Sequence, residues 1–137
     1  MEELEFRQAV NKALAEWFET NAPECFIQWE NGPEYDAPED EAGPWFDVSL
    51  RYYAGNTASL GGRPVARLSG TISIYLYQRQ GEGTYRVDEL LGGLARLLRH
   101  TNFGPARTSA PQRSAPQEHL GWYKTGLFVP FTLDIMS

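Results

Sequence analysis

The chain has 137 residues, a net charge of −6, 42% hydrophobic residues and 13% aromatic residues. This length and apolar content predict one domain with a single core, and a charged fraction of 22% excludes wholesale disorder. The acidic balance argues against a dedicated nucleic-acid-binding protein, which would carry a basic patch. No apolar run reaches the length of a membrane span, and the acidic N-terminal segment is unlike a secretory signal.

The N-terminal segment predicts a helix over residues 2–20. Acidic residues in its first turn suit the helix dipole, and Asn21 and Pro23 mark its end. The apolar residues of this helix recur at helical spacing and are Phe6, Val10, Leu14, Trp17 and Phe18. After the helix, a short strand is expected over residues 25–30.

Two glycine- or proline-containing loops flank the next strand. Residues 31–44 contain three prolines and several acids and predict an exposed loop, with an acidic partner-facing segment as the alternative. The spacing of the acidic residues in this segment does not match a calcium-binding EF-hand loop. Clean alternation over 45–53 predicts a strand with one apolar face. Residues 54–65 predict a loop; no Lys-Ser or Lys-Thr pair follows their glycines, which excludes a phosphate-binding loop.

A long strand is expected over residues 66–80. Ile72 and Ile74 lie on its apolar face, whereas Tyr75 and Tyr77 lie on a half-polar face that we expect to meet a neighbour. About fifteen residues exceeds the usual strand length, so we expect the strand to project beyond the sheet or to continue as a hairpin arm.

A helix is expected after a glycine turn, with Thr84 as its N-cap and an apolar stripe ending at Leu98. Gly92 and Gly93 weaken this helix by up to about 1 kcal/mol each, which predicts close packing at that point. Residues 101–117 predict a long loop with a short strand near 106–110.

The chain closes on a predicted strand over residues 121–135. Pro130 lacks an N–H donor, so this strand is expected to run at a sheet edge or to be bulged there. The expected order is α-β-β-β-α-β-β. These elements predict one α+β domain over residues 1–137, with a mainly antiparallel sheet of about four to five strands packed by two helices.

The sequence contains few residues that could act as a nucleophile, a general base or a metal ligand. Cys25 has apolar neighbours, His100 ends a helix and His119 lies in the late loop, so we predict no catalytic residue, no metal site and no cofactor site. The single cysteine excludes an intrachain disulfide and favours a reducing compartment. A carboxylate pair stays open, because spatial pairing is invisible in a sequence. Three tryptophans beside turns or at strand ends indicate either sheet-edge packing or protein contact: Trp29, Trp45 and Trp122.

Four segments in this order carry a resemblance. They are the helix FRQAVNKALAEWF, the strand GPWFDVSLRY after an acidic loop, the unit RLSGTISIYLYQRQGEGTYRVDELLGGLARLL and the closing strand GWYKTGLFVPFTLDI. This arrangement resembles the tail terminator (tail completion) proteins of long-tailed bacteriophages over nearly the whole chain. It rests on a pattern of strand, glycine turn, helix and aromatic strand, with no invariant catalytic motif.

The resemblance implies a structural virion protein and not an enzyme. Such a protein forms a ring, commonly a hexamer, which caps the tail tube, stops tube polymerisation and offers a docking surface to the head-side connector. The implied partners are further copies of this chain, the tail tube protein and the connector or stopper protein, with no membrane. The implied location is the head-proximal end of the virion tail, and the host cytoplasm during assembly.

DNA would pass through the ring without specific binding, and an acidic lumen would repel it. Closed rings use heterologous interfaces, in which different patches meet. The alternatives are another head–tail connector component (a stopper or a tube-like protein) or a small ligand-binding or enzymatic α+β domain. The candidate interface residues are Tyr75, Tyr77, Arg63, Arg67, Arg107, Arg113 and Trp122.

Overall fold

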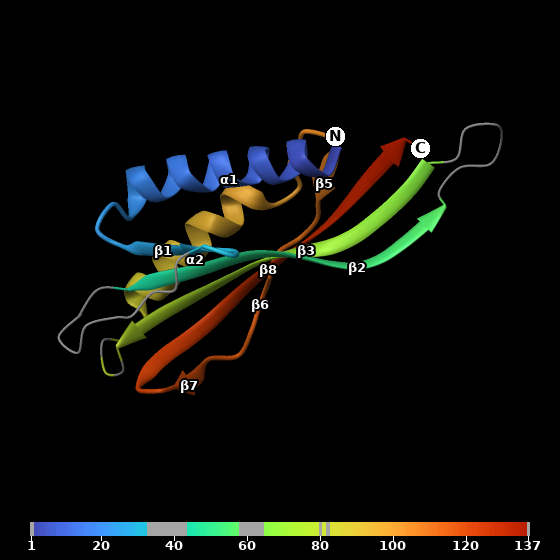
Figure 1. The fold of residues 1–137 in the computed structure, drawn as a ribbon. Helices are drawn as coiled ribbons and strands as arrows, with labels where there is room; N and C mark the ends of the chain where they lie inside the picture. Colours follow the sequence, from blue (N-terminus) through green and yellow to red (C-terminus); the bar gives the residue numbers. More distant parts are fainter. Residues whose placement is uncertain (1, 33–43, 58–64, 80, 82, 137) are drawn as a thin grey trace.

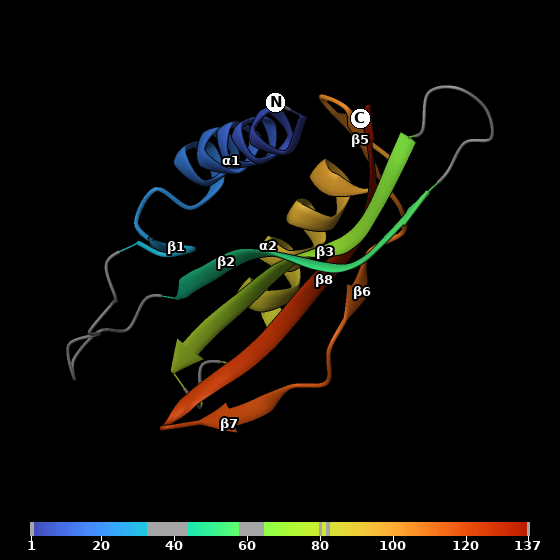
Figure 2. The ribbon, with the colours of Figure 1, turned by 45° about the vertical axis from the view of Figure 1, so that its right-hand side comes forward.

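The structure is a computed structural model that describes residues 2–32, 44–57, 65–79, 81 and 83–136. It consists of one strongly curled sheet with two helices on the same face (Figure 1). A view turned by 45° shows the same one-sided cover (Figure 2). Most of the predicted acidic loop, residues 33–43, and the candidate interface residue Arg63 lie outside the described residues.

Two helices and eight strands are formed within the described residues. Their order is α1 (Glu2–Asn21), β1 (Phe26–Trp29), β2 (Trp45–Thr57), β3 (Val65–Arg79), α2 (Tyr85–Leu98), β4 (Asn102–Phe103), β5 (Ala106–Thr108), β6 (Gln112–Arg113), β7 (Gln117–His119) and β8 (Trp122–Met136). The sheet order is β1-β2-β3-β8-β5-β4, and β6 and β7 also pair with β8. β1 runs parallel to β2, and the other pairings are antiparallel.

The predicted fold class, an α+β domain with four to five strands packed by two helices in the order α-β-β-β-α-β-β, is wrong. The described residues form eight strands in one curled half-barrel sheet, in which strand outweighs helix. The short strand expected near residues 106–110 is present as β5, and the difference comes from β4, β6 and β7. Each of these three strands is two or three residues long. Strands this short show no alternation, yet β4 finds backbone partners on β5, and β6 and β7 find them along the edge of β8.

The core lies between the helices and the sheet face that they cover, here called the inner face. The predicted stripes of both helices are confirmed, and each fully buried Leu, Ile or Phe contributes roughly 1.5–3 kcal/mol. The far ends of β2, β3 and β8 extend together past the helices, so the overlong strand stays paired along its length (Figure 1). The buried sheet residues include Phe46, Val48, Ile72, Ile74, Leu76, Leu127, Val129, Phe131 and Leu133.

The helix glycines differ in their surroundings. A Cβ added at Gly93 would lie 2.7 Å from Cζ2 of Trp17, so the predicted close packing is confirmed there. At Gly92 a Cβ would meet only the Arg96 guanidinium at 3.9 Å, so close packing does not explain that glycine. Thr84 is the N-cap of α2, as predicted, and its carbonyl accepts a hydrogen bond from the Asp88 N–H at 2.9 Å, but its side chain makes no cap hydrogen bond.

Pro130 lies in the interior of the sheet. Its strand, β8, pairs with β3 on one side, so β8 is not an edge strand. On the other side, the carbonyl of Pro130 accepts a hydrogen bond from the Ser109 N–H in the gap between β5 and β6. The N and the C=O of one strand residue point to the same side, so the missing donor faces this gap. The short strands thus leave the proline where no ladder hydrogen bond is lost.

Gly70 is the tightest point of the sheet. A Cβ there would overlap the carbonyl oxygen of Arg51 and would lie 2.7 Å from Cζ of Phe131. The β2–β3 register shifts at the same place: Tyr52 pairs with Gly70, and Ala54 pairs with Ser69. Tyr53 is therefore the extra residue of a β-bulge, which forms where a glycine lets the neighbouring backbone come close.

Gly70→Ala is expected to destabilise the fold by about 1–3 kcal/mol, because the new methyl meets backbone that cannot move aside. Gly92→Ala is the matched control, since it has room for a Cβ and gains up to about 1 kcal/mol of helix propensity. Urea denaturation of both variants measures the two effects. Equal stability of the two variants would contradict this account of Gly70.

Candidate interaction surface

The sheet face opposite the helices is here called the open face. Side chains alternate along each strand, and cross-strand partners share a face, so the register defines its members. The members with described side chains are Trp45, Asp47, Ser49 and Arg51 of β2; Arg67, Ser69, Thr71, Ser73, Tyr75, Tyr77 and Arg79 of β3; Trp122, Lys124, Gly126, Phe128, Pro130, Thr132 and Asp134 of β8; and Arg107, Gln112 and Gln117 of β5, β6 and β7.

Stacked rings and cations cover one end of the open face. Trp45 and Tyr77 are stacked with centroids 4.0 Å apart, and Trp122 meets Trp45 edge-on at 5.9 Å. The Arg79 guanidinium lies 4.0 Å from the Trp122 ring, and the Lys124 ammonium lies 4.3 Å from the Tyr75 ring. Such pairs contribute roughly 0.5–1.5 kcal/mol each.

These rings protect one another from water. Although no helix covers them, Tyr77 is only 6% exposed and Trp122 only 8% exposed. Burial, reinforced by the nearby Asp47 and Tyr75, raises the pKa of Tyr77 to about 12. A Cβ at Gly126 would lie 3.0 Å from the Tyr75 ring, so this glycine leaves space for the cluster.

The open face is cationic in an acidic protein. It carries five cations against two carboxylates, whereas the whole chain has a net charge of −6. Arg67 donates to both carboxylate oxygens of Asp134, at 2.8 and 3.2 Å. Arg51 makes no ion pair with any carboxylate of the described residues. Burial raises the pKa of Asp47, and the charges of Lys124 and Arg51 oppose this effect.

A hollow of about 380 Å³ lies in the middle of the open face. Arg51 and Tyr53 stand on its β2 side, and Phe128 and Gln112 on the opposite side. Ser73 lies in its wall; this side chain is 1% exposed, and its hydroxyl has no hydrogen-bond partner among the described residues. A buried hydroxyl without a hydrogen-bond partner is destabilising by roughly 1–3 kcal/mol.

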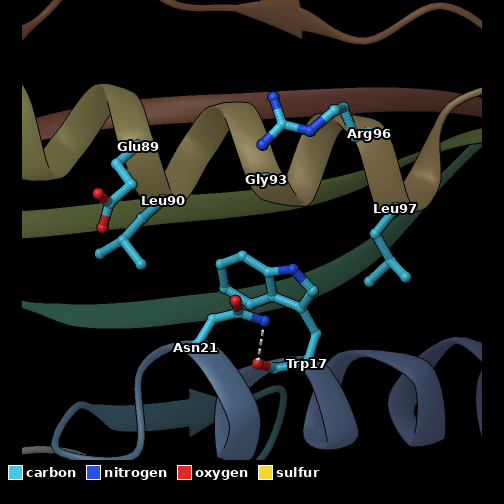
Figure 3. A pocket seen from close by; sticks show the side chains of 7 residues that line it. All are labelled: Trp17, Asn21, Glu89, Leu90, Gly93, Arg96 and Leu97. Carbon is cyan, nitrogen blue, oxygen red and sulfur yellow. Dashed lines mark hydrogen bonds between the residues drawn. The ribbon is translucent and has the colours of Figure 1, made fainter.

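A second hollow, of about 400 Å³, lies between the two helices (Figure 3). The indole of Trp17 points from α1 toward Gly93 on α2, while Glu89 and Arg96 lie along α2 beyond its two sides. The Asn21 amide donates to the Trp17 carbonyl at 2.9 Å, and Glu89 is paired with Arg86. Because Asn21 and Glu89 have local partners and the Trp17 indole lies against Gly93, we interpret this hollow as a gap in the packing of the two helices.

Groups that could support catalysis are scattered. Cys25 is half-buried, and its thiol donates to the Glu24 carboxylate at 3.8 Å. His100 is exposed at the end of α2. No group of three or more His, Cys, Asp and Glu side chains in the described part of the chain is arranged to hold a metal ion. Within the same residues, no helix is both long and apolar enough to cross a membrane.

Five of the seven candidate interface residues share the open face. Tyr75, Tyr77, Arg67, Arg107 and Trp122 lie there by register, although Tyr77 and Trp122 are covered within the subunit.

The sixth candidate, Arg113, has the register of the inner face and pairs with Asp88 of α2 at 2.9 Å. The seventh, Arg63, is outside the described residues. The sequence reasoning did not select Arg51, Tyr53 or Lys124 as interface candidates, and it left Trp45 open between sheet-edge packing and protein contact. Alternation along β2 and β8 could have identified them as members of one polar face.

Comparison with known proteins supports the fold alone. No protein-family model matches the sequence, and no curated protein matches it. Eleven chains of solved structures match. One of them, whose name gives no function, has a TM-score of 0.72 at 16% identity over 97% of this chain and 96% of its own.

Asp47→Asn is expected to flatten the pH dependence of stability in the acid range. The folded protein holds the Asp47 proton more tightly than the unfolded chain, so stability falls as pH rises from the ordinary pKa of 3.8 through the raised folded value. Asparagine removes this loss and is expected to stabilise the protein at neutral pH. Urea unfolding across the acid range measures the effect.

Asp134→Asn is the control of opposite sign. Its Arg67 partner lowers the pKa of Asp134, so its contribution is present above the ordinary pKa and is lost as pH falls through the folded value. Both groups of this pair are about half exposed, so the effect is expected to be small. A loss of neutral-pH stability in Asp47→Asn would contradict the account of Asp47.

Proposed function

We propose that this chain is a tail terminator of a long-tailed bacteriophage. Copies of it form a ring, with a hexamer as the expected state, that caps the tail tube and stops its polymerisation. The opposite side of the ring offers the docking surface for the head-side connector. DNA passes through the lumen without specific binding.

One observation carries the proposal: the helices cover only one face of a long sheet, and the open face presents groups that the subunit leaves unsatisfied. Arg51 has no ion-pair partner among the described residues, and the Ser73 hydroxyl, described in the same part of the chain, has no hydrogen-bond partner. Tyr53 is 67% exposed beside them. Exposed arginine and tyrosine together are typical of the energetic centres of protein interfaces.

The resemblance to tail terminator proteins supports a ring as the kind of assembly that this surface forms. The strand–turn–helix unit and the aromatic closing strand that carry it correspond to β3, α2 and β8. All three contribute to the core, and β3 and β8 also form much of the open face. A protein that works through a broad sheet face and a heterologous interface suits a ring. The acidic net charge also suits a channel through which DNA slides.

Light scattering on the purified chain is expected to give a ring mass at high concentration. Polymerising tail tube protein with this chain present should yield shorter tubes with capped ends under electron microscopy, and tails assembled without it should be overlong. A monomer at every concentration, together with an unchanged tube length, would contradict the proposal. Normal-length tubes that fail to join heads would instead indicate a stopper.

A further inference from the structure

We propose that neighbouring subunits join through one contact: Tyr53 and Arg51 of one copy dock against the groove between α1 and β1 of the next copy. In this contact Tyr53 enters the groove, and Arg51 pairs with Glu19 at its rim. The inference deepens the proposed function and rests on it, since it assigns the surfaces through which the ring closes.

The projecting element is built into the backbone of β2. Tyr53 is the extra residue of the bulge opposite Gly70, and a bulge re-aims the side chain that it carries. Tyr53 is 67% exposed, which is a large exposed aromatic surface for a single subunit. A tyrosine that enters a site buries roughly 150–250 Å² at a low cost in side-chain entropy.

The receiving groove lies on the other side of the molecule. It has a volume of about 320 Å³ and is mostly apolar, with Phe18, Ile27 and Trp29 among its lining residues. Glu19 stands at the groove, is exposed, and makes no ion pair within the described residues. An apolar hollow with one carboxylate thus complements a tyrosine with one guanidinium.

Charge favours the same arrangement over longer distance. α1 carries five glutamates against Arg7 and Lys12, and Arg7 is engaged with Glu30 at 2.5 Å. The open face carries an excess of cations, so the α1 side of one copy attracts the open face of another. Such complementarity steers association and suppresses wrong pairings.

The two patches are different surfaces of one subunit, so the contact is heterologous. It propagates from copy to copy and closes as a ring when the rotation permits, whereas a two-fold dimer would bring like patches together.

A charge-swap cycle tests the contact. Arg51→Glu and Glu19→Arg are each expected to raise the concentration needed for half-assembly by about tenfold or more, and the double variant is expected to restore assembly toward wild type. Tyr53→Ala should weaken assembly by about tenfold or more. Arg99→Glu, at an exposed position after α2, makes the same change of charge as Arg51→Glu and should assemble as wild type.

Light scattering across a concentration series gives the assembly midpoint, and thermal melting confirms that each variant is folded. If the wild-type ring forms and Arg51→Glu assembles equally well, this contact is overturned while the proposed function stands. If both single variants fail and the double variant is not restored, the Arg51–Glu19 pairing is wrong. A wild-type monomer or two-fold dimer would overturn the proposed function itself.

Discussion

The one-sided cover of the sheet is the constraint on which the rest of the structure depends. Both helices pack on the inner face, so their apolar stripes and the inward residues of β2, β3 and β8 form one continuous core. No second layer covers the open face among the described residues, so its own side chains must keep water from the middle of the sheet. The stack of Trp45 on Tyr77, bordered by Trp122, Arg79 and Lys124, does this at one end. Around the central hollow the cover is incomplete, and Arg51 and the Ser73 hydroxyl lie there without an ion-pair or hydrogen-bond partner, respectively, among the described residues.

Packing in the core and exposure on the open face are linked at Gly70. Because Gly70 has no side chain, Phe131 lies against it from the inner face and the carbonyl of Arg51 approaches from β2. The resulting register shift makes Tyr53 the additional residue of the strand. Tyr52, its neighbour, packs edge-on against Phe131 with centroids 5.5 Å apart. The same local geometry therefore anchors one tyrosine in the structure and directs the next one outward.

The sequence allowed the regular elements to be predicted, because long elements repeat their pattern many times. The stripe from Phe6 to Phe18 and the alternation in β3 and β8 each extend over several periods, and the structure confirms them. The fold class was wrong because three further strands in residues 102–119, β4, β6 and β7, are too short for any period and form only where β5 or β8 provides an edge. The serine- and proline-rich composition of that segment correctly indicates turns, but turn signals cannot show that the residues between them pair with a distant strand.

The candidate surface was predictable in part for the same reason. Tyr75 and Tyr77 were assigned to one face by alternation alone, but the pairing of Tyr77 with Lys124 and Trp45 depends on register between strands far apart in the chain. That register also separates Arg113, on the inner side with Asp88, from Arg107, on the open face. Alternation within a strand predicts which face of the sheet a residue lies on. Its neighbours on that face depend on the pairing of strands that are far apart in the sequence.

The distribution of unsatisfied groups limits how copies of this subunit can satisfy one another. Arg51, Tyr53 and Ser73 lie around the hollow of the open face, while Glu19 borders an apolar groove beside α1 and β1. Bringing two open faces together would oppose cation to cation and would leave both grooves empty. Bringing an open face to an α1 side pairs opposite charges and fills one hollow with the residue that the other patch projects. The pair then has one open face and one groove still available, on different subunits, and such a contact can repeat from copy to copy until a ring closes.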